Sequence, residues 1–163
     1  MGWTATHYLP AAQQGEARLQ AHFGLVAQAA HDAGFPHVWI ALACADGERS
    51  FGGDRVEGIA RELAAIPGVD VIGVNCTAPP AIAALVRALH AASDKPVSIC
   101  PNLGQHWETD AHALAGGATE AEFLRRVPEW LALGVTHIGG CCGVGPSTIA
   151  ALAAIVREVR AAR

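Results

Sequence analysis

Apolar residues along the chain form two kinds of pattern, short continuous runs and longer stretches with helical spacing. The continuous runs are rich in Val, Ile and Ala, which is typical of strands with both faces covered in a parallel sheet. They predict strands over residues 37–44, 69–75, 97–100 and 135–140. Between and around them, apolar residues recur at helical spacing, which predicts helices over residues 13–33, 56–66, 77–89, 119–133 and 146–159.

Two stretches show no clear period. Residues 1–10 are consistent with a short strand that ends near Tyr8, and residues 101–118 follow the strand at 97–100 without regular spacing. Long irregular segments are often lids over binding sites. We therefore predict that residues 101–118, which include His106 and Trp107, form a lid over the site described below.

Strand and helix alternate in units of about 30 residues, repeated about four times, which predicts an α/β fold with parallel βα units. With 163 residues the chain is long enough for a core of its own, so we expect residues 1–163 to form a single domain. Neither a G-x-G-x-x-G sequence nor a phosphate loop with Lys opens any predicted helix. This argues against Rossmann-like nucleotide binding.

Composition and charge narrow the function classes. The chain is 52% hydrophobic and 16% charged, with a formal net charge of -4. Lys and Arg are scattered and form no basic stripe, so we expect no nucleic-acid partner. No apolar run approaches the roughly 18 residues that span a bilayer, and the first residues do not resemble a secretory signal. We therefore expect a cytoplasmic protein with no membrane partner.

All five cysteines lie at the carboxyl ends of predicted strands or just beyond them: Cys44, Cys76, Cys100, Cys141 and Cys142. In a parallel sheet or barrel these ends meet at one rim, so we expect the thiols to gather there. In the absence of a secretory signal, we expect reduced thiols that serve as metal ligands, nucleophiles or buried apolar groups rather than as disulfides.

The sequence Gly139-Gly140-Cys141-Cys142 places two adjacent thiols at a glycine-rich strand end, where packing explains them poorly. Cys76, at the end of another strand, supplies the third ligand that a zinc site needs. A zinc ion with three protein thiolates keeps a fourth position open, where a substrate thiol would lose its proton and become a nucleophile for S-alkylation. We expect Cys44 and Cys100 to be packed thiols instead, because free cysteine is often simply buried.

The segments Gly73-Val74-Asn75-Cys76 and Gly139-Gly140-Cys141-Cys142, with Pro101-Asn102-Leu103-Gly104-Gln105 between them, resemble the zinc-dependent homocysteine S-methyltransferase family. That family includes the betaine- and S-methylmethionine-dependent enzymes. The resemblance covers residues 37–160. It implies methyl transfer from a small donor to the thiol of homocysteine, with methionine as the product.

The resemblance also implies roles for individual residues. Cys76, Cys141 and Cys142 would be the ligands of a Zn2+ ion, and Asn75 and Asn102 would lie beside homocysteine. Either asparagine can instead serve only its local turn, since Asn is common at such positions.

The chain departs from the family pattern in ways that affect fold and substrate binding. The family fold is a closed eight-stranded barrel of nearly twice this length, and the chain resembles its carboxyl half. His7 stands where an amine-binding Glu is expected, Gln105 where many members have Glu, and Cys100 where many have Tyr.

A half barrel leaves two edge strands and an open inner face. We therefore predict a partial TIM-type barrel that is closed by dimerisation or by a separate chain with the complementary half. Two other functions stay open: a zinc-binding half-barrel subunit that is inactive alone, and a thiol-binding module without turnover.

Overall fold

The computed structural model describes residues 3–6, 16–35, 37–110 and 112–162. A five-stranded sheet organises this part of the chain, with the strand order β1-β2-β3-β4-β7. All four neighbouring pairs are parallel. The strands are β1 (Trp3–Thr6), β2 (Val38–Ala43), β3 (Val69–Asn75), β4 (Val97–Cys100) and β7 (Val135–Ile138). The predicted α/β fold with parallel βα units is confirmed, and the sheet is open with β1 and β7 at its edges.

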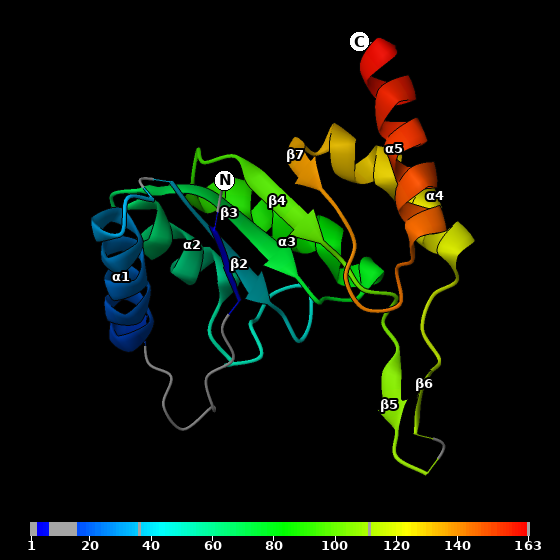
Figure 1. Ribbon diagram of the computed structural model, residues 1–163, viewed down its shortest axis with the longest axis horizontal. Coiled ribbons are helices and arrows are strands. Elements are labelled where there is room, and N and C mark those ends of the chain that lie inside the picture. The colour runs from blue at the N-terminus through cyan, green and yellow to red at the C-terminus, as the bar shows by residue number, and fades with distance from the viewer. Residues whose placement is uncertain (1–2, 7–15, 36, 111, 163) are drawn as a thin grey trace.

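The helices connect successive strands and pack against the sheet or against each other (Figure 1). Helices α2 and α3 contact β3, and α4 contacts both β7 and α5. Their bounds are α1 (Glu16–Asp32), α2 (Val56–Ala64), α3 (Pro79–Ala92), α4 (Glu120–Ala132) and α5 (Pro146–Ala161). Thr119 caps α4 through a reciprocal capping box with Glu122, which explains why this helix begins where the sequence predicts.

The hydrophobic core lies between the sheet and the helices. On β2 its members alternate, as Val38, Ile40 and Leu42, and the same cluster includes helix residues such as Leu85 and Trp130. The opposite face of the sheet is the one that would line a barrel. The helix-facing side chains therefore form the main core, and the cysteines gather beyond the carboxyl ends of the strands.

Gly73 lies on the face opposite the core, in β3, which runs between β2 and β4. A Cβ on Gly73 would overlap the carbonyl oxygen of Ser98, so no larger residue fits there. Across this surface the ring of Trp39 lies 4.4 Å from that of His137, centroid to centroid. His137 also shares a hydrogen bond of 2.9 Å with the hydroxyl of Thr136. Small residues on the middle strands thus let one large aromatic side chain cover the face.

The segment between β4 and α4 contains regular structure that the sequence did not predict, while its expected role as a lid stays a prediction. It contains an antiparallel hairpin, β5 (His106–Glu108) paired with β6 (Ala113–Ala115), which projects away from the sheet (Figure 1). Each strand is three residues long, too short for a hydrophobic period to be visible in the sequence.

At the amino terminus, β1 ends at Thr6, while Tyr8 and His7 lie outside the described residues, so the expectation placed on His7 has no structural counterpart. Among the helices that the structure describes, none combines the length and the apolar character that a bilayer crossing requires.

Candidate metal centre

The segment that leaves β4 holds two other strand ends in place. The backbone N–H of Cys76, just beyond β3, donates to the carbonyl of Cys100 at 3.1 Å. The N–H of Cys141, beyond β7, donates to the carbonyl of Pro101 at 2.8 Å. Because both bonds end on consecutive residues of one strand extension, the cysteines that follow β3 and β7 are brought to the same point of the rim.

The next residues of the same segment continue this arrangement. Asn102 donates its N–H to the carbonyl of Thr77 at 3.2 Å, and Leu103 donates its N–H to the carbonyl of Cys142 at 3.1 Å. The two loops are therefore joined through residues 100–103 by backbone hydrogen bonds, which do not depend on the side chains of the cysteines.

Local backbone conformation directs the thiols. Cys76 has a φ of 46°, the left-handed region that residues other than glycine rarely adopt. That conformation costs roughly 1–2 kcal/mol, and the bonds described above hold it. Beyond β7, Gly143 has a φ of 81°, and a Cβ on Gly140 would overlap the side chain of Val144. The rim thus combines a strained backbone at Cys76 with glycines at 140 and 143, where a side chain would clash or be strained.

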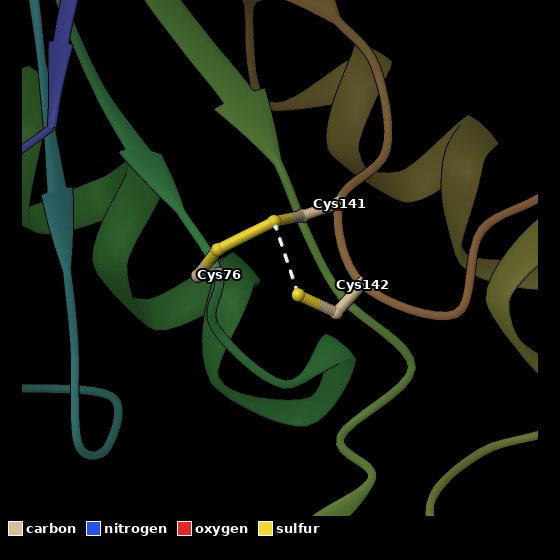
Figure 2. A group of neighbouring side chains, drawn as sticks. All are labelled: Cys76, Cys141 and Cys142. Carbon is tan, nitrogen blue, oxygen red and sulfur yellow. Dashed lines mark hydrogen bonds between the residues drawn. A yellow bond between two sulfur atoms is a disulfide. The ribbon is translucent and has the colours of Figure 1, made fainter. Parts of the chain in front are cut away.

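The sulfur atoms of Cys76, Cys141 and Cys142 all lie within 4.8 Å of one another (Figure 2). The Sγ atoms of Cys141 and Cys142 are 3.8 Å apart. Zinc–sulfur bonds of about 2.3 Å at tetrahedral angles separate two ligand sulfurs by about 3.8 Å. Cys76 and Cys141 are half-buried and Cys142 is exposed, which leaves one side of the cluster accessible. The donor set and its spacing fit a zinc ion with an open fourth position.

In this structure Cys76 and Cys141 are joined by a disulfide, with their Cα atoms 5.7 Å apart (Figure 2). The expectation that the thiols remain free is therefore wrong for this pair. The reason is geometric, because thiols that converge on one ion are also close enough to bond to each other. A disulfide sulfur is not a thiolate, so oxidation and metal binding at this cluster exclude each other. Only the reduced pair suits a metal.

The other two cysteines lie apart from this group. Cys44 is 2% exposed within the core, and burial raises the pKa of its thiol to about 12. Cys100 is half-buried, burial also raises its pKa, and its Sγ lies 3.2 Å from where a Cβ on Gly139 would be. The prediction that Cys44 is a packed thiol is confirmed. Cys100 lies at the rim beside the cluster but outside the group of converging sulfurs.

The two predicted asparagines lie next to the cysteines in the fold. Asn75 is the last residue of β3, half-buried and paired with Cys100 of β4. The Oδ1 of Asn102 accepts a hydrogen bond of 2.7 Å from the N–H of Gly104. Asn102 therefore serves the local turn, as one of its two interpretations requires, and lies in the segment that joins the loops.

One further residue at this rim was not predicted as a site residue. The Oε1 of Gln105 is buried against Gly143, immediately after the cysteine pair. In the sequence Gln105 stood out only as a departure from the family pattern. The two glycines that make room for its side chain, Gly117 and Gly143, lie elsewhere in the sequence, so no local signal marked the position of Gln105.

Comparisons with known proteins agree with this geometry. The family model described as homocysteine S-methyltransferase matches residues 8–156. Homocysteine S-methyltransferase 4 of Zea mays is 37% identical over 123 residues, which are 74% of this chain and 36% of that protein. Homocysteine S-methyltransferase of Escherichia coli (strain K12) is 32% identical over 117 residues, 71% of this chain and 38% of that protein.

Solved structures of a homocysteine methyltransferase are also similar to this chain. The homocysteine methyltransferase MmuM from Escherichia coli in its metallated form matches with a TM-score of 0.65 and 26% identity, covering 86% of this chain and 42% of that chain. Its oxidised form matches with a TM-score of 0.66, 26% identity and the same two coverages. The chain spans about a third of the length of the curated relatives it matches.

Proposed function

The chain belongs to the homocysteine S-methyltransferase family, and we propose that it transfers a methyl group from a small donor to the thiol of homocysteine, with zinc held by Cys76, Cys141 and Cys142. The observation that carries the proposal is the convergence of three sulfur atoms within 4.8 Å at the ends of two parallel strands. In the reaction the donor loses its bond to the methyl carbon, homocysteine loses its thiol proton, and a new sulfur–carbon bond gives methionine.

The fit of the cluster to zinc defines what each part of the site contributes. A zinc ion bound there supplies positive charge that favours the thiolate form of a substrate thiol at neutral pH. The three cysteines bind the ion, and exposed Cys142 lies on the side where the substrate enters. Asn75 and Asn102 orient the amino-acid part of homocysteine. The Oδ1 of Asn102 accepts the N–H of Gly104, which leaves its amide N–H groups to donate to the substrate.

The redox state of the cluster sets a condition for activity. Zinc needs Cys76 and Cys141 as thiolates, whereas this structure joins them in a disulfide. The related structures titled metallated and oxidised are both similar to this chain. A reducing compartment such as the cytoplasm would keep the cluster ready for metal, and we propose that the protein acts there as a single domain.

The open sheet bears on the form in which the protein is active. The described part of the chain supplies five strands, with β1 and β7 at the edges, whereas a TIM-type barrel has eight. A second copy would bring five more, so a dimer does not close such a barrel by simple addition. The count favours a further segment or a complementary chain with three strands over the homodimer, and we propose that such a partner completes the barrel.

Methionine formation tests the proposed reaction. The reduced, zinc-loaded protein is incubated with homocysteine and, in separate reactions, S-methylmethionine, S-adenosylmethionine or betaine. We expect methionine with at least one donor and none with the Cys142→Ser variant, which lacks one of the three thiolates. If the wild-type protein neither binds homocysteine nor forms methionine, the proposed function is wrong.

A subunit or thiol-binding role is the second candidate, and the open sheet favours it. In that case the zinc-loaded protein binds homocysteine without turnover. Metal content measured together with molar mass in solution distinguishes this role from the active enzyme. A monomer with full zinc and no methionine formation indicates a subunit that is inactive alone.

A further inference from the structure

Helix α5 is covered less completely than the helices in the middle of the chain. On α3 the side chains of Ile82 and Leu85 are 0% exposed. On α5 Leu152 is buried to a similar degree, at 4%, but Ile149 is 40% exposed and Val156 is half-buried. The apolar residues of α5 therefore extend beyond the surface that its neighbours cover.

The incompletely covered residues lie on one side of α5. Ile149, Val156 and Arg160 follow each other at intervals of seven and four residues, which places them in one row along a helix. On another side, the hydroxyl of Thr148 donates a hydrogen bond to the carboxylate of Glu120 in α4. Within the described residues α4 is the element that contacts α5 extensively, and it lies along one side of that helix (Figure 1).

An edge strand and a cavity adjoin this row of residues. In the described sheet β7 pairs with β4 and has no strand on its other side, so backbone groups of that edge are unpaired. A cavity of about 260 Å³ lies between β7 and the two helices. It is lined by Leu131, Gly134, Val135, Thr136, Val159 and Arg160. We call the edge of β7, this cavity and the row Ile149, Val156 and Arg160 the β7–α5 surface.

The rest of the fold shows which kind of element fits such a surface. Each of β2, β3 and β4 has a parallel strand on both sides. The helices contact one another in chain order, from α1 with α2 to α4 with α5. The next member of this series is a strand parallel to β7 with a helix against α5. The solved relative in its metallated form has further chain of this kind available, because the match covers 42% of it.

The side chains of the surface restrict the partner further. Ile149 and Val156, together with the apolar wall of the cavity, favour apolar partner residues. Arg160 is exposed and forms no ion pair with any residue that the structure describes. An acidic partner residue at this position would pair with its guanidinium group.

We propose that the β7–α5 surface binds a βα unit of a complementary chain. The strand of that unit adds in parallel to the edge of β7, and its helix places apolar residues against Ile149 and Val156 and an acidic residue near Arg160. The inference rests on the proposed function, in which a partner completes the barrel, and it names the surface and the chemistry by which this partner binds.

The test uses a partner chain of known sequence. This chain is co-expressed with the part of Escherichia coli homocysteine S-methyltransferase that it does not match, so that the two chains fold together. Light scattering gives the molar mass of the purified product, and we expect one copy of each chain. Ile149→Asp should weaken the complex by about 10-fold or more, because a carboxylate would be buried among apolar residues. Ile149→Leu should bind like the wild-type chain.

Two controls separate binding from folding. Ile149 is exposed in the chain alone and lies near the amino end of α5, where a negative charge is favourable. Denaturant unfolding should therefore give the same stability for the Ile149→Asp chain and the wild type. Phe51→Asp is the matched control, since Phe51 is also an exposed apolar residue but follows β2, which is three strands from β7. It should leave the complex intact.

The outcomes for the two proposals differ. If Ile149→Asp and Phe51→Asp bind the partner equally well, or if the wild-type chain purifies without it, the inference is wrong. The inference is also overturned if the chain alone has twice its expected mass and Ile149→Asp halves it, because a second copy then occupies the surface. If the complex forms as expected but yields no methionine with any donor, the proposed reaction is wrong and the β7–α5 surface stands.

Discussion

Cys44 and Cys76 lie just beyond neighbouring parallel strands, yet their thiols have opposite environments. Cys44 follows β2, is 2% exposed and has a pKa raised to about 12 by burial. Cys76 follows β3, is half-buried and converges with Cys141 and Cys142. Thr77, the residue after Cys76, links the two strand ends. Its hydroxyl accepts a hydrogen bond of 3.0 Å from the N–H of Cys44. Location at a strand end is thus insufficient to identify a metal ligand.

Backbone direction explains the difference. Cys44 continues the alternation of Ile40 and Leu42, whose side chains face the helices, and so it enters the core. Val74 of β3 also faces the core, so regular alternation would bury Cys76 in the same way. The left-handed conformation at Cys76, with a φ of 46°, interrupts the alternation at that residue. One residue of unusual backbone separates a candidate ligand from a packed thiol.

The largest expected effect is on metal binding. Cys76→Ser should lower zinc affinity by more than roughly 100-fold, the upper end of what the loss of an outer-shell partner costs, because it removes a ligand itself. Cys44→Ser should retain about one zinc per chain, since the Cys44 thiol faces the core. Zinc content after equilibration with a competing chelator under reducing conditions measures both variants. Full zinc retention by Cys76→Ser would remove the distinction between the two strand ends.

Much of the fold was predictable because its signals are local. Residues 69–75 and 97–100 were predicted with the bounds that β3 and β4 have, since apolar runs bounded by Pro, Gly or Asn mark buried strands. The hairpin in 101–118 was missed because strands of three residues show no period. The predicted strand in residues 1–10 is present as β1, and the expected end near Tyr8 lies outside the described residues.

Less of the candidate site than of the fold could be predicted from the sequence. Strand ends in a parallel sheet meet at one rim, which allowed Cys76 to be grouped with the distant cysteine pair. The burial of Cys44 depends on which face of β2 meets the helices, and a continuous apolar run does not reveal this. The disulfide and the position of Gln105 depend on contacts between segments far apart in the chain, and no single stretch of sequence encodes them.

A second effect is expected on stability at high pH. The thiol of Cys44 has an ordinary pKa of 9.0 and a folded pKa of about 12. Above pH 9 the unfolded chain releases this proton while the folded protein keeps it. The stabilisation is therefore complete below about pH 9 and is lost progressively up to about pH 12, by about 1.4 kcal/mol per pH unit.

Comparison with Cys44→Ala isolates this titration. The free energy of unfolding of each protein is measured by denaturant titration at intervals above pH 9. We expect the wild-type value to fall more steeply than that of Cys44→Ala, because alanine has no proton to release. If the free energies of unfolding of the two proteins fall equally with pH, Cys44 has the same pKa in the folded and unfolded states. Burial would then not distinguish the Cys44 thiol from the thiols at the rim.

The smallest effect concerns Cys100, which lies between the two extremes. It is half-buried, its Sγ lies near Gly139, and burial raises its pKa. It ends β4 and is the first residue of the segment that joins the cysteine loops, but its sulfur is not one of the three that converge. We expect Cys100→Ala to keep full zinc content and to lower the free energy of unfolding by about 1 kcal/mol, close to the value for one buried methylene. Zinc analysis and denaturant unfolding of the same sample measure both quantities.

The backbone carbonyl of Cys100, which accepts a hydrogen bond of 3.1 Å from the N–H of Cys76, remains in this variant. Loss of zinc from Cys100→Ala would therefore implicate the thiol itself, and the rim would then hold four functional sulfurs rather than three.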